Sequence, residues 1–192
     1  MEILELTAAA IIEAREETGD PPARIGPATF EPLMRRHERM VLATALRLLG
    51  DLEDAKDASQ EVFLKLYRHL GKQEAGANLA GWLYRVTVNT CHDMRRRAKG
   101  EALSAEVERA ADPAFDPHQD AAHAERRAAL EMSLRVLSEK ERAALVLRDL
   151  EGLSTAEVAA ILGSKEATVR SQIAKARIKM KAFVERYFRR RT

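Results

Sequence analysis

The sequence predicts an all-α protein: two small helical domains joined by an acidic flexible linker, the second with a helix-turn-helix. Three observations support this. Aromatic residues are only 5% of the 192 residues and charged residues 32%, which favours helices over an aromatic-rich β-sandwich. Apolar residues recur at helical spacing along most of the chain, without convincing strand-like alternation. An acidic stretch with two prolines interrupts this pattern once, which divides the helical regions into two.

Residues 1–27 form an N-terminal extension ahead of the first domain. Residues 2–17 have the apolar spacing of an amphipathic helix. Proline and glycine then cluster in "GDPPARIGP", which predicts a linker before the first domain begins. The extension is therefore predicted to be separate from the helical domain that follows.

Residues 28–100 are predicted to form the first helical domain. Three apolar stripes predict three helices: Leu33 to Leu48 with a stop at Gly50, Ala55 to Leu70, and Leu83 to Met94. The segment "GKQEAGAN" between the second and third stripes predicts a loop. No internal repeat is visible.

Residues 101–124 are predicted to be the linker, and residues 125–192 the second domain. From Glu101 to Glu125 there are seven acidic residues against Arg109 alone, a net charge of −6. Capping boxes at 138–141 and 154–157 predict helices that begin just after Ser138 and Ser154. From Ser164 to Thr192 there are ten basic and two acidic residues, a net of +8, although the whole chain carries only +2. Opposite local charges indicate separate surfaces with separate partners.

Residues 154–181 have the organisation of a helix-turn-helix: a short helix to Leu162, a turn at Gly163–Ser164, and a basic helix from Lys165. In the second helix Val169, Ile173, Ala176 and Met180 share one face and are predicted to be buried. The candidate DNA-binding residues of this helix are Lys165, Thr168, Arg170, Ser171, Lys175 and Arg177. Arg and Ser can contact base edges and Lys can neutralise phosphate. A solvated basic face on an ordinary helical hairpin is the alternative.

Two further polar stripes lie in the first domain. Asp54, Asp57 and Glu61, flanked by Gln60, line one face of the second helix. Carboxylates there are more often solvated charge than catalysts, and the face can also dock a basic protein. The third helix carries a stripe and a basic end, whose candidate residues are Arg85, Asn89, His92, Arg95, Arg96 and Arg97. Asn and His can pair with an exposed base while arginines hold phosphates, although a basic last turn also complements the helix dipole.

Cys91 is the only cysteine, so the sequence predicts no disulfide and no cysteine metal site, as in a reducing cytoplasmic compartment. No cofactor and no other metal site is predicted, because no His or Cys falls at ligand spacing. Cys91 lies at the edge of an apolar stripe, which favours a small core residue over a redox group. The longest apolar run, Leu6 to Ile12, is too short to span a bilayer, so no membrane insertion is expected.

Three segments in this order resemble the sigma factors of bacterial RNA polymerase, specifically the extracytoplasmic function (ECF) group. Residues 30–68 are similar to regions 2.1–2.2 of that family, residues 81–97 ("GWLYRVTVNTCHDMRRR") to regions 2.3–2.4, and residues 137–181 to region 4. The short acidic linker marks this group, since it leaves no room for the region 3 domain of primary sigma factors.

The resemblance implies that the first domain binds the −10 promoter element and the second the −35 element, with core RNA polymerase contacted through its β′ clamp helices and β flap. Asp54, Asp57, Gln60 and Glu61 would dock on the clamp helices, and Asn89 would take up a flipped base during melting. Where primary sigma factors carry adjacent tryptophans as a melting wedge, this chain has only Trp82. An anti-sigma factor is also implied as a partner.

Two other function classes remain open on the sequence. A generic two-domain helix-turn-helix regulator that does not bind core polymerase is the chief alternative, because response-regulator output domains carry a similar motif. A hydrolase has little support, since the chain lacks a positioned histidine, a phosphate-binding loop and a metal-ligand set. The sequence thus predicts a promoter-specificity factor and not an enzyme.

Overall fold

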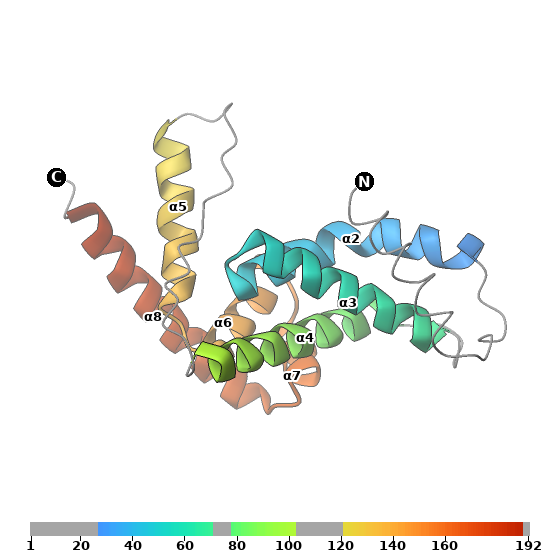
Figure 1. Ribbon diagram of the computed structural model, residues 1–192. Helices are drawn as coiled ribbons and strands as arrows, with labels where there is room; N and C mark the ends of the chain where they lie inside the picture. Colours follow the sequence, from blue (N-terminus) through green and yellow to red (C-terminus); the bar gives the residue numbers. More distant parts are fainter. Residues whose placement is uncertain (1–26, 71–77, 103–120, 190–192) are drawn as a thin grey trace.

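The computed structural model describes residues 27–70, 78–102 and 121–189, and all regular elements in these ranges are helices (Figure 1). In chain order they are α2 (Pro27–Leu49), α3 (Leu52–Leu70), α4 (Leu79–Ala102), α5 (Ala121–Arg135), α6 (Glu139–Leu145), a π-helical turn η1 (Val146–Leu150), α7 (Thr155–Leu162) and α8 (Glu166–Arg189). The all-α prediction is confirmed. Residues 1–26 of the extension, with its predicted helix at 2–17, lie outside the described residues, as does most of the predicted linker.

Helices α2, α3 and α4 pack into the first domain around side chains from all three apolar stripes. Its core includes Val41 of α2, Phe63 of α3 and Leu83 of α4, each with no exposed surface. Gly50 ends α2 with a φ of 81°, a left-handed conformation that favours glycine. The next residue, Asp51, accepts a hydrogen bond from the backbone N–H of Asp54 at 3.0 Å and so begins α3. The predicted stop at Gly50 is therefore confirmed.

Helices α5 to α8 form the second domain, and both predicted capping boxes are present. The Ser138 hydroxyl accepts from the N–H of Glu141, whose carboxylate accepts from the N–H of Ser138. The box after Ser154 has the same pattern. Gly163 turns the chain between α7 and α8 with a φ of 59°. The predicted helix-turn-helix thus forms with its caps where the sequence places them.

The helices are longer than the sequence predicts at three ends. Helix α8 continues past Lys181 to Arg189, where the rings of Phe183 and Tyr187 stack one turn apart at 6.3 Å between centroids. Helix α4 runs to Ala102 and α5 begins at Ala121, so helix extends into both ends of the predicted linker. Alanine, the residue with the highest helix propensity, is frequent in these extensions.

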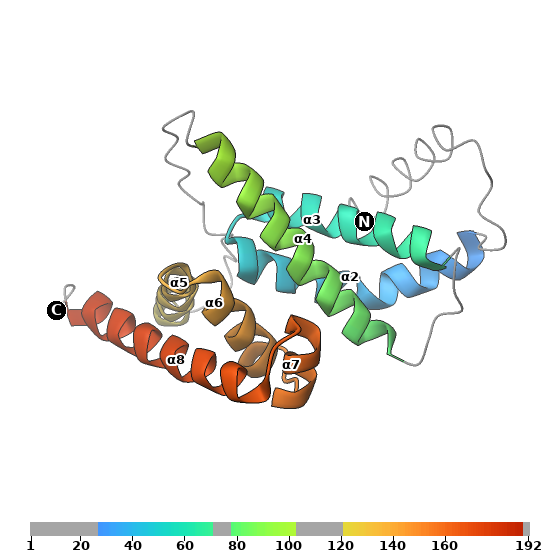
Figure 2. The same ribbon diagram turned by 90° about the horizontal axis from the view of Figure 1, so that it is seen from below.

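The two domains pack against each other, which the sequence does not predict. Figure 2 shows α7 beside the middle of α4, and the two helices are in contact. One apolar cluster joins Tyr84, Val88 and Cys91 of α4 to residues of the second domain that include Val158 and Ile161 of α7. The protein therefore has a core that lies across the domain boundary. No described helix is long and apolar enough to cross a membrane.

Candidate nucleic-acid interface

Helix α4 presents the predicted polar stripe because its opposite face is buried. Leu83, Val88 and Cys91 are in the core, while Arg85 and Asn89 are exposed. The remaining candidates on α4 differ in exposure: His92 and Arg95 are partly buried, and Arg96 and Arg97 are exposed. The structure therefore brings all six residues to one side and one end of a single helix, as the sequence spacing predicts.

Several residues of this stripe contact the second domain. Arg85 donates a hydrogen bond to the backbone carbonyl of Ala160, at 2.8 Å. Glu139, at the start of α6, accepts from Lys99 at 2.6 Å and lies 3.2 Å from Nδ1 of His92. The hydrogen bond from Lys99 lowers the pKa of the Glu139 carboxyl, which stays ionised at neutral pH. The stripe is thus partly occupied by the protein itself.

Arg95 and Arg96, at the basic end of α4, contact residues of the first domain. Arg95 donates to the carbonyl of Leu48 at 3.3 Å, at the carboxyl end of α2, where a cation complements the helix dipole. Arg96 forms an ion pair with Asp93 at 3.0 Å on its own helix. An exposed ion pair of this kind contributes only about 0–1 kcal/mol, so Arg96 can exchange it for a phosphate at little cost.

The second polar face belongs to the helix-turn-helix. All six candidates on or just before α8 are exposed: Lys165, Thr168, Arg170, Ser171, Lys175 and Arg177. Arg170 pairs with Glu166 one turn earlier at 2.6 Å. Arg177 forms two hydrogen bonds with Asp149 at 2.7 and 2.9 Å, and these raise the pKa of its guanidinium. The candidate residues of α8 are therefore exposed, as predicted. Two of them, Arg170 and Arg177, form ion pairs with acidic residues of the same domain.

The two polar faces meet around a half-open cavity of about 560 Å³ between the domains. Asn89 and His92 line it from α4, and Thr168 and Gln172 line it from α8. Residues separated by some eighty positions along the chain are therefore neighbours. Among the candidate residues, Asn89, His92 and Thr168 therefore line one cavity, while Arg170 and Ser171 are exposed outside its lining.

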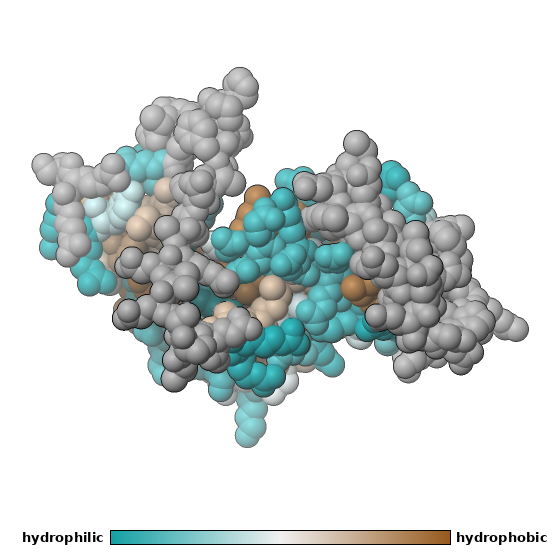
Figure 3. Space-filling model, in the orientation of Figure 1, coloured by the Kyte–Doolittle hydropathy of each residue, from teal (hydrophilic) through white to brown (hydrophobic). Residues whose placement is uncertain are grey.

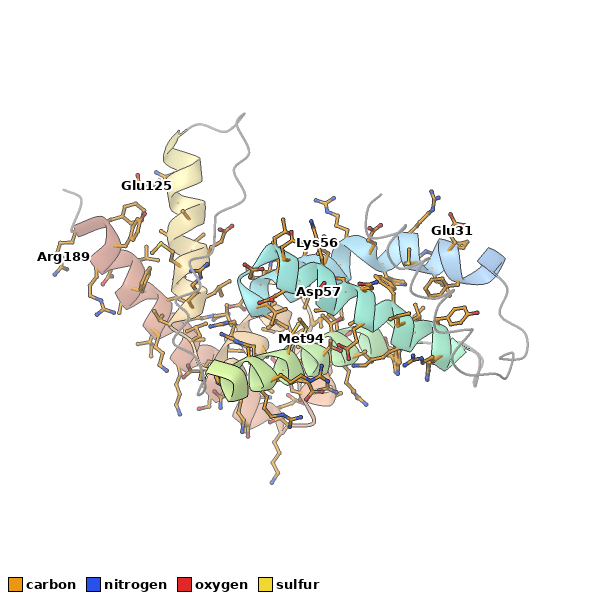
Figure 4. The ribbon with its side chains drawn as sticks, in the orientation of Figure 1. Glu31, Lys56, Asp57, Met94, Glu125 and Arg189 are labelled. Atoms are coloured by element: carbon orange, nitrogen blue, oxygen red, sulfur yellow. The ribbon has the colours of Figure 1, made fainter. Side chains whose placement is uncertain are left out.

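The acidic stripe of α3 lies away from this cavity. Asp57 is exposed, as Figure 4 shows on the outer side of α3, and Asp54, Gln60 and Glu61 are half-buried. Glu61 pairs with Lys65 at 2.8 Å. Within the described ranges, no three His, Cys, Asp or Glu side chains come together as a metal site. The acidic stripe therefore remains a candidate docking face on the surface of α3.

Comparison with known proteins identifies both domains. The sequence profile of sigma-70 region 2 matches residues 33–101, and that of sigma-70 region 4 matches residues 127–180. Together these cover more than half of the chain. The ECF RNA polymerase sigma factor SigE of Mycolicibacterium smegmatis is 36% identical over 188 residues, which cover 95% of this chain and 70% of that protein. The chain belongs to the ECF group of the sigma-70 family.

Two further comparisons agree with this family. The ECF sigma-E factor of Escherichia coli is 31% identical over 90% of this chain and 92% of its own length. The solved structure of CnrH in complex with the cytosolic domain of CnrY superposes with a TM-score of 0.60 at 26% identity, covering 83% of this chain and 90% of that one. The sigma factor RpoE of Bartonella quintana, solved in complex with the anti-sigma factor NepR, shares the fold of this chain. The TM-score is 0.68 at 24% identity, over 82% of this chain and 97% of that one. The protein is an alternative sigma factor, and a generic regulator is not favoured.

Trp82 of the sigma factor is held in the first domain. Its ring stacks on His69 at 4.4 Å between centroids and packs, half-buried, against the first-domain core. Trp82 therefore lies on the apolar side of α4. A ring fixed in this way is poorly placed to wedge between bases.

Several residues that organise this interface were missed by the sequence reasoning. Arg142 is buried and donates to the carbonyls of Leu134, Leu137 and Leu48, the last in the other domain. Burial lowers the pKa of its guanidinium to about 10, so it remains charged. Glu151 of the second domain likewise accepts hydrogen bonds from Arg47 and Tyr84 of the first domain. Nothing in the local sequence distinguishes these side chains from surface charges.

We expect the Cys91 thiol to be unreactive in the folded sigma factor. It is 2% exposed, and burial raises its pKa to about 12. Alkylation by iodoacetamide at pH 8, followed by mass spectrometry, should be slower than in denaturant by about a hundredfold or more, because almost no thiolate forms. Equal rates in the two conditions would reopen a redox role for Cys91.

Proposed function

We propose that this sigma factor binds core RNA polymerase, directs it to promoters by reading the −10 element with α4 and the −35 element with α8, and helps to melt the DNA. The observation that carries the proposal is that two polar helix faces, on domains matching regions 2 and 4, bear the residue types that contact bases and phosphates. On this proposal the protein acts by binding and not by catalysis.

The −10 element would be bound by the polar stripe of α4. Asn89, exposed on that stripe, has an amide that can pair with the edge of an unstacked base. Arg85 and Arg96 lie on either side of it, where they can bind phosphates of the same strand. Trp82 is engaged with His69, which supports melting by base capture more than by a stacking wedge.

The −35 element would be bound by α8 in the major groove, as helix-turn-helix proteins place their second helix. Arg170 and Ser171 near its start are suited to base edges, and Lys175 to a phosphate. The Arg170–Glu166 ion pair is exposed, with 64% and 47% of the two side chains accessible. Arg170 can therefore leave Glu166 for a base at small cost.

Substitutions on α8 should separate base reading from phosphate binding. Arg170→Ala is expected to weaken −35 binding by about 1–3 kcal/mol and to relax selectivity at one base pair. Lys175→Ala should weaken binding to all sequences and reduce the salt dependence. Binding of holoenzyme to promoter libraries at several salt concentrations measures both effects. The same sequence-independent loss in both variants would move base readout elsewhere.

The proposed partners of the sigma factor rest on its family and on its exposed faces. The acidic stripe of α3 would dock on the β′ clamp helices of core polymerase, and the region 4 domain would contact the β flap. Two solved structures of similar fold are the sigma factor RpoE with the anti-sigma factor NepR, and CnrH with the cytosolic domain of CnrY. We include an anti-sigma factor that covers the DNA-binding faces among the partners of this chain.

Reconstitution with core polymerase tests the proposal. The full chain should co-purify with core enzyme and select a subset of promoters from a genomic library. It should then open them, as detected by permanganate reaction of unpaired thymines. A chain that binds duplex DNA by itself but never associates with core polymerase would instead be a generic regulator.

A further inference from the structure

Arg177 of α8 is held by a carboxylate from outside its own helix. Asp149 of η1 accepts from Nε of Arg177 at 2.9 Å and from Nη2 at 2.7 Å. This side-on, bidentate geometry fixes the plane of the guanidinium as well as its position. The N–H groups on the other edge, at Nη1 and Nη2, stay available to a second acceptor. Arg177 accordingly keeps 62% of its side chain accessible, although one edge is paired.

The π-helical turn η1 places Asp149 beside α8. This turn is wider than an α-helical one, and the N–H of Glu151 closes it by donating to the carbonyl of Val146 at 2.9 Å. Val146 and Leu147 anchor the turn in the core with no exposed surface. Only 24% of the Asp149 side chain is accessible. The carboxylate is therefore a fixed anchor for Arg177 and not a mobile surface charge.

Arg177 lies at the edge of the candidate DNA face of α8. It follows Arg170 by two helical turns on the same side of the helix. Further along α8, the rings of Phe183 and Tyr187 are half-buried and stack on each other. Helix α8 also contacts α5, and Figure 3 shows apolar areas near these two helices. The polar face thus ends near Arg177, where a helix in the major groove would meet the phosphates that flank the groove.

We propose that Asp149 is a positioning residue, which holds Arg177 in the orientation that binds a DNA phosphate and so sets how α8 docks on the −35 element. That α8 lies on DNA rests on the proposed function. A carboxylate beside this face repels phosphates, and an exposed ion pair contributes little to stability. Its benefit is pre-ordering: an arginine already fixed in its bound orientation loses less side-chain entropy when DNA binds.

Duplex DNA of random sequence tests Asp149, because non-specific binding depends on phosphate contacts. A fluorescent duplex is titrated with the full chain by anisotropy at several salt concentrations. Asp149→Ala should weaken binding about three- to fivefold although it removes a negative charge, because Arg177 must then be ordered on binding. The slope of log affinity against log salt should become shallower by up to about 0.9, the value of one phosphate contact. Repulsion alone predicts the opposite result, tighter binding with an unchanged slope.

A double-mutant cycle shows whether Asp149 acts through Arg177. In the Arg177→Ala background, Asp149→Ala should no longer weaken binding, since the residue that it positions is gone. Asp149→Asn keeps the shape of the side chain but has a single acceptor oxygen, and should show most of the loss. Glu185→Ala is the matched control: it removes an acidic residue of α8 whose ion pair with Lys181 spans 3.9 Å, and should not weaken binding. Circular dichroism verifies that the helices are retained.

Tighter or unchanged binding by both Asp149 variants would overturn the positioning role. A loss that persists in full in the Arg177→Ala background would overturn it as well. Lys175→Ala tests the proposed function separately, because Lys175 is a phosphate contact that Asp149 does not hold. If Lys175→Ala binds random duplex as tightly as wild type, α8 is not the DNA-binding helix, and the proposed function and the positioning role fail together. Weaker binding by Lys175→Ala with unaffected Asp149 variants removes the positioning role alone.

Discussion

Charge reversal on the acidic stripe of α3 is expected to abolish most holoenzyme formation. Asp54→Lys with Asp57→Lys places two cations against a surface proposed to be basic, and like-charge contacts cost several kcal/mol. That corresponds to a loss of affinity for core polymerase on the order of a hundredfold or more. Asp57 is exposed and no described core contact uses either carboxylate, so the fold should persist. Titration of labelled sigma factor with core enzyme measures the loss.

The control for this experiment is a single charge reversal on another helix, which changes the charge half as much as the double reversal. Glu31→Lys lies on α2, where Glu31 is exposed and paired with Arg35. It should leave polymerase affinity within about a few fold, because an exposed pair of this type contributes little. We avoid Glu61 as the principal site because Lys65, its partner, also donates to Thr90 of α4. Unchanged affinity after the double reversal would remove the stripe from the polymerase interface.

Replacing Asn89 by alanine is expected to impair promoter opening but not closed-complex formation. The amide can pair only with a base that has left its stack, so the contact exists only after strand separation. Loss of one bidentate contact should destabilise the open complex by about 1–3 kcal/mol. Permanganate reaction of unpaired thymines measures the effect on duplex promoters, and holoenzyme affinity measures it on pre-melted promoters. On the pre-melted promoter the Asn89→Ala holoenzyme should show little of this defect, because no base pairs have to be opened there.

A neighbouring arginine distinguishes base capture from general DNA binding. Arg97 is exposed at the basic end of α4, and Arg97→Ala should weaken binding to duplex and pre-melted promoters alike, through loss of a phosphate contact. Normal opening of duplex DNA by the Asn89→Ala holoenzyme would exclude Asn89 from melting. An equal defect on both templates would make it a phosphate-positioning residue.

The local features of the fold were predictable because each depends on residues close together in the chain. Ser138 and Glu141 form their capping box across one helical turn, and Gly50 stops α2 by its own backbone conformation. The polar faces of α4 and α8 follow from helical periodicity in the same way. The extended end of α8 was missed because the basic residues there hide the continuing aromatic spacing of Phe183 and Tyr187.

The sequence by itself determined the helices, their caps, the exposed faces and, through the order of its motifs, the sigma-factor family. Only the tertiary structure decided how the two domains meet. Glu151 and Arg47 are 104 positions apart, and Arg142 reaches Leu48 over 94. A charged residue that packs across such a separation has the same local pattern as one in solvent. Its role is set by which surfaces come together, and periodicity within one helix carries no information about that.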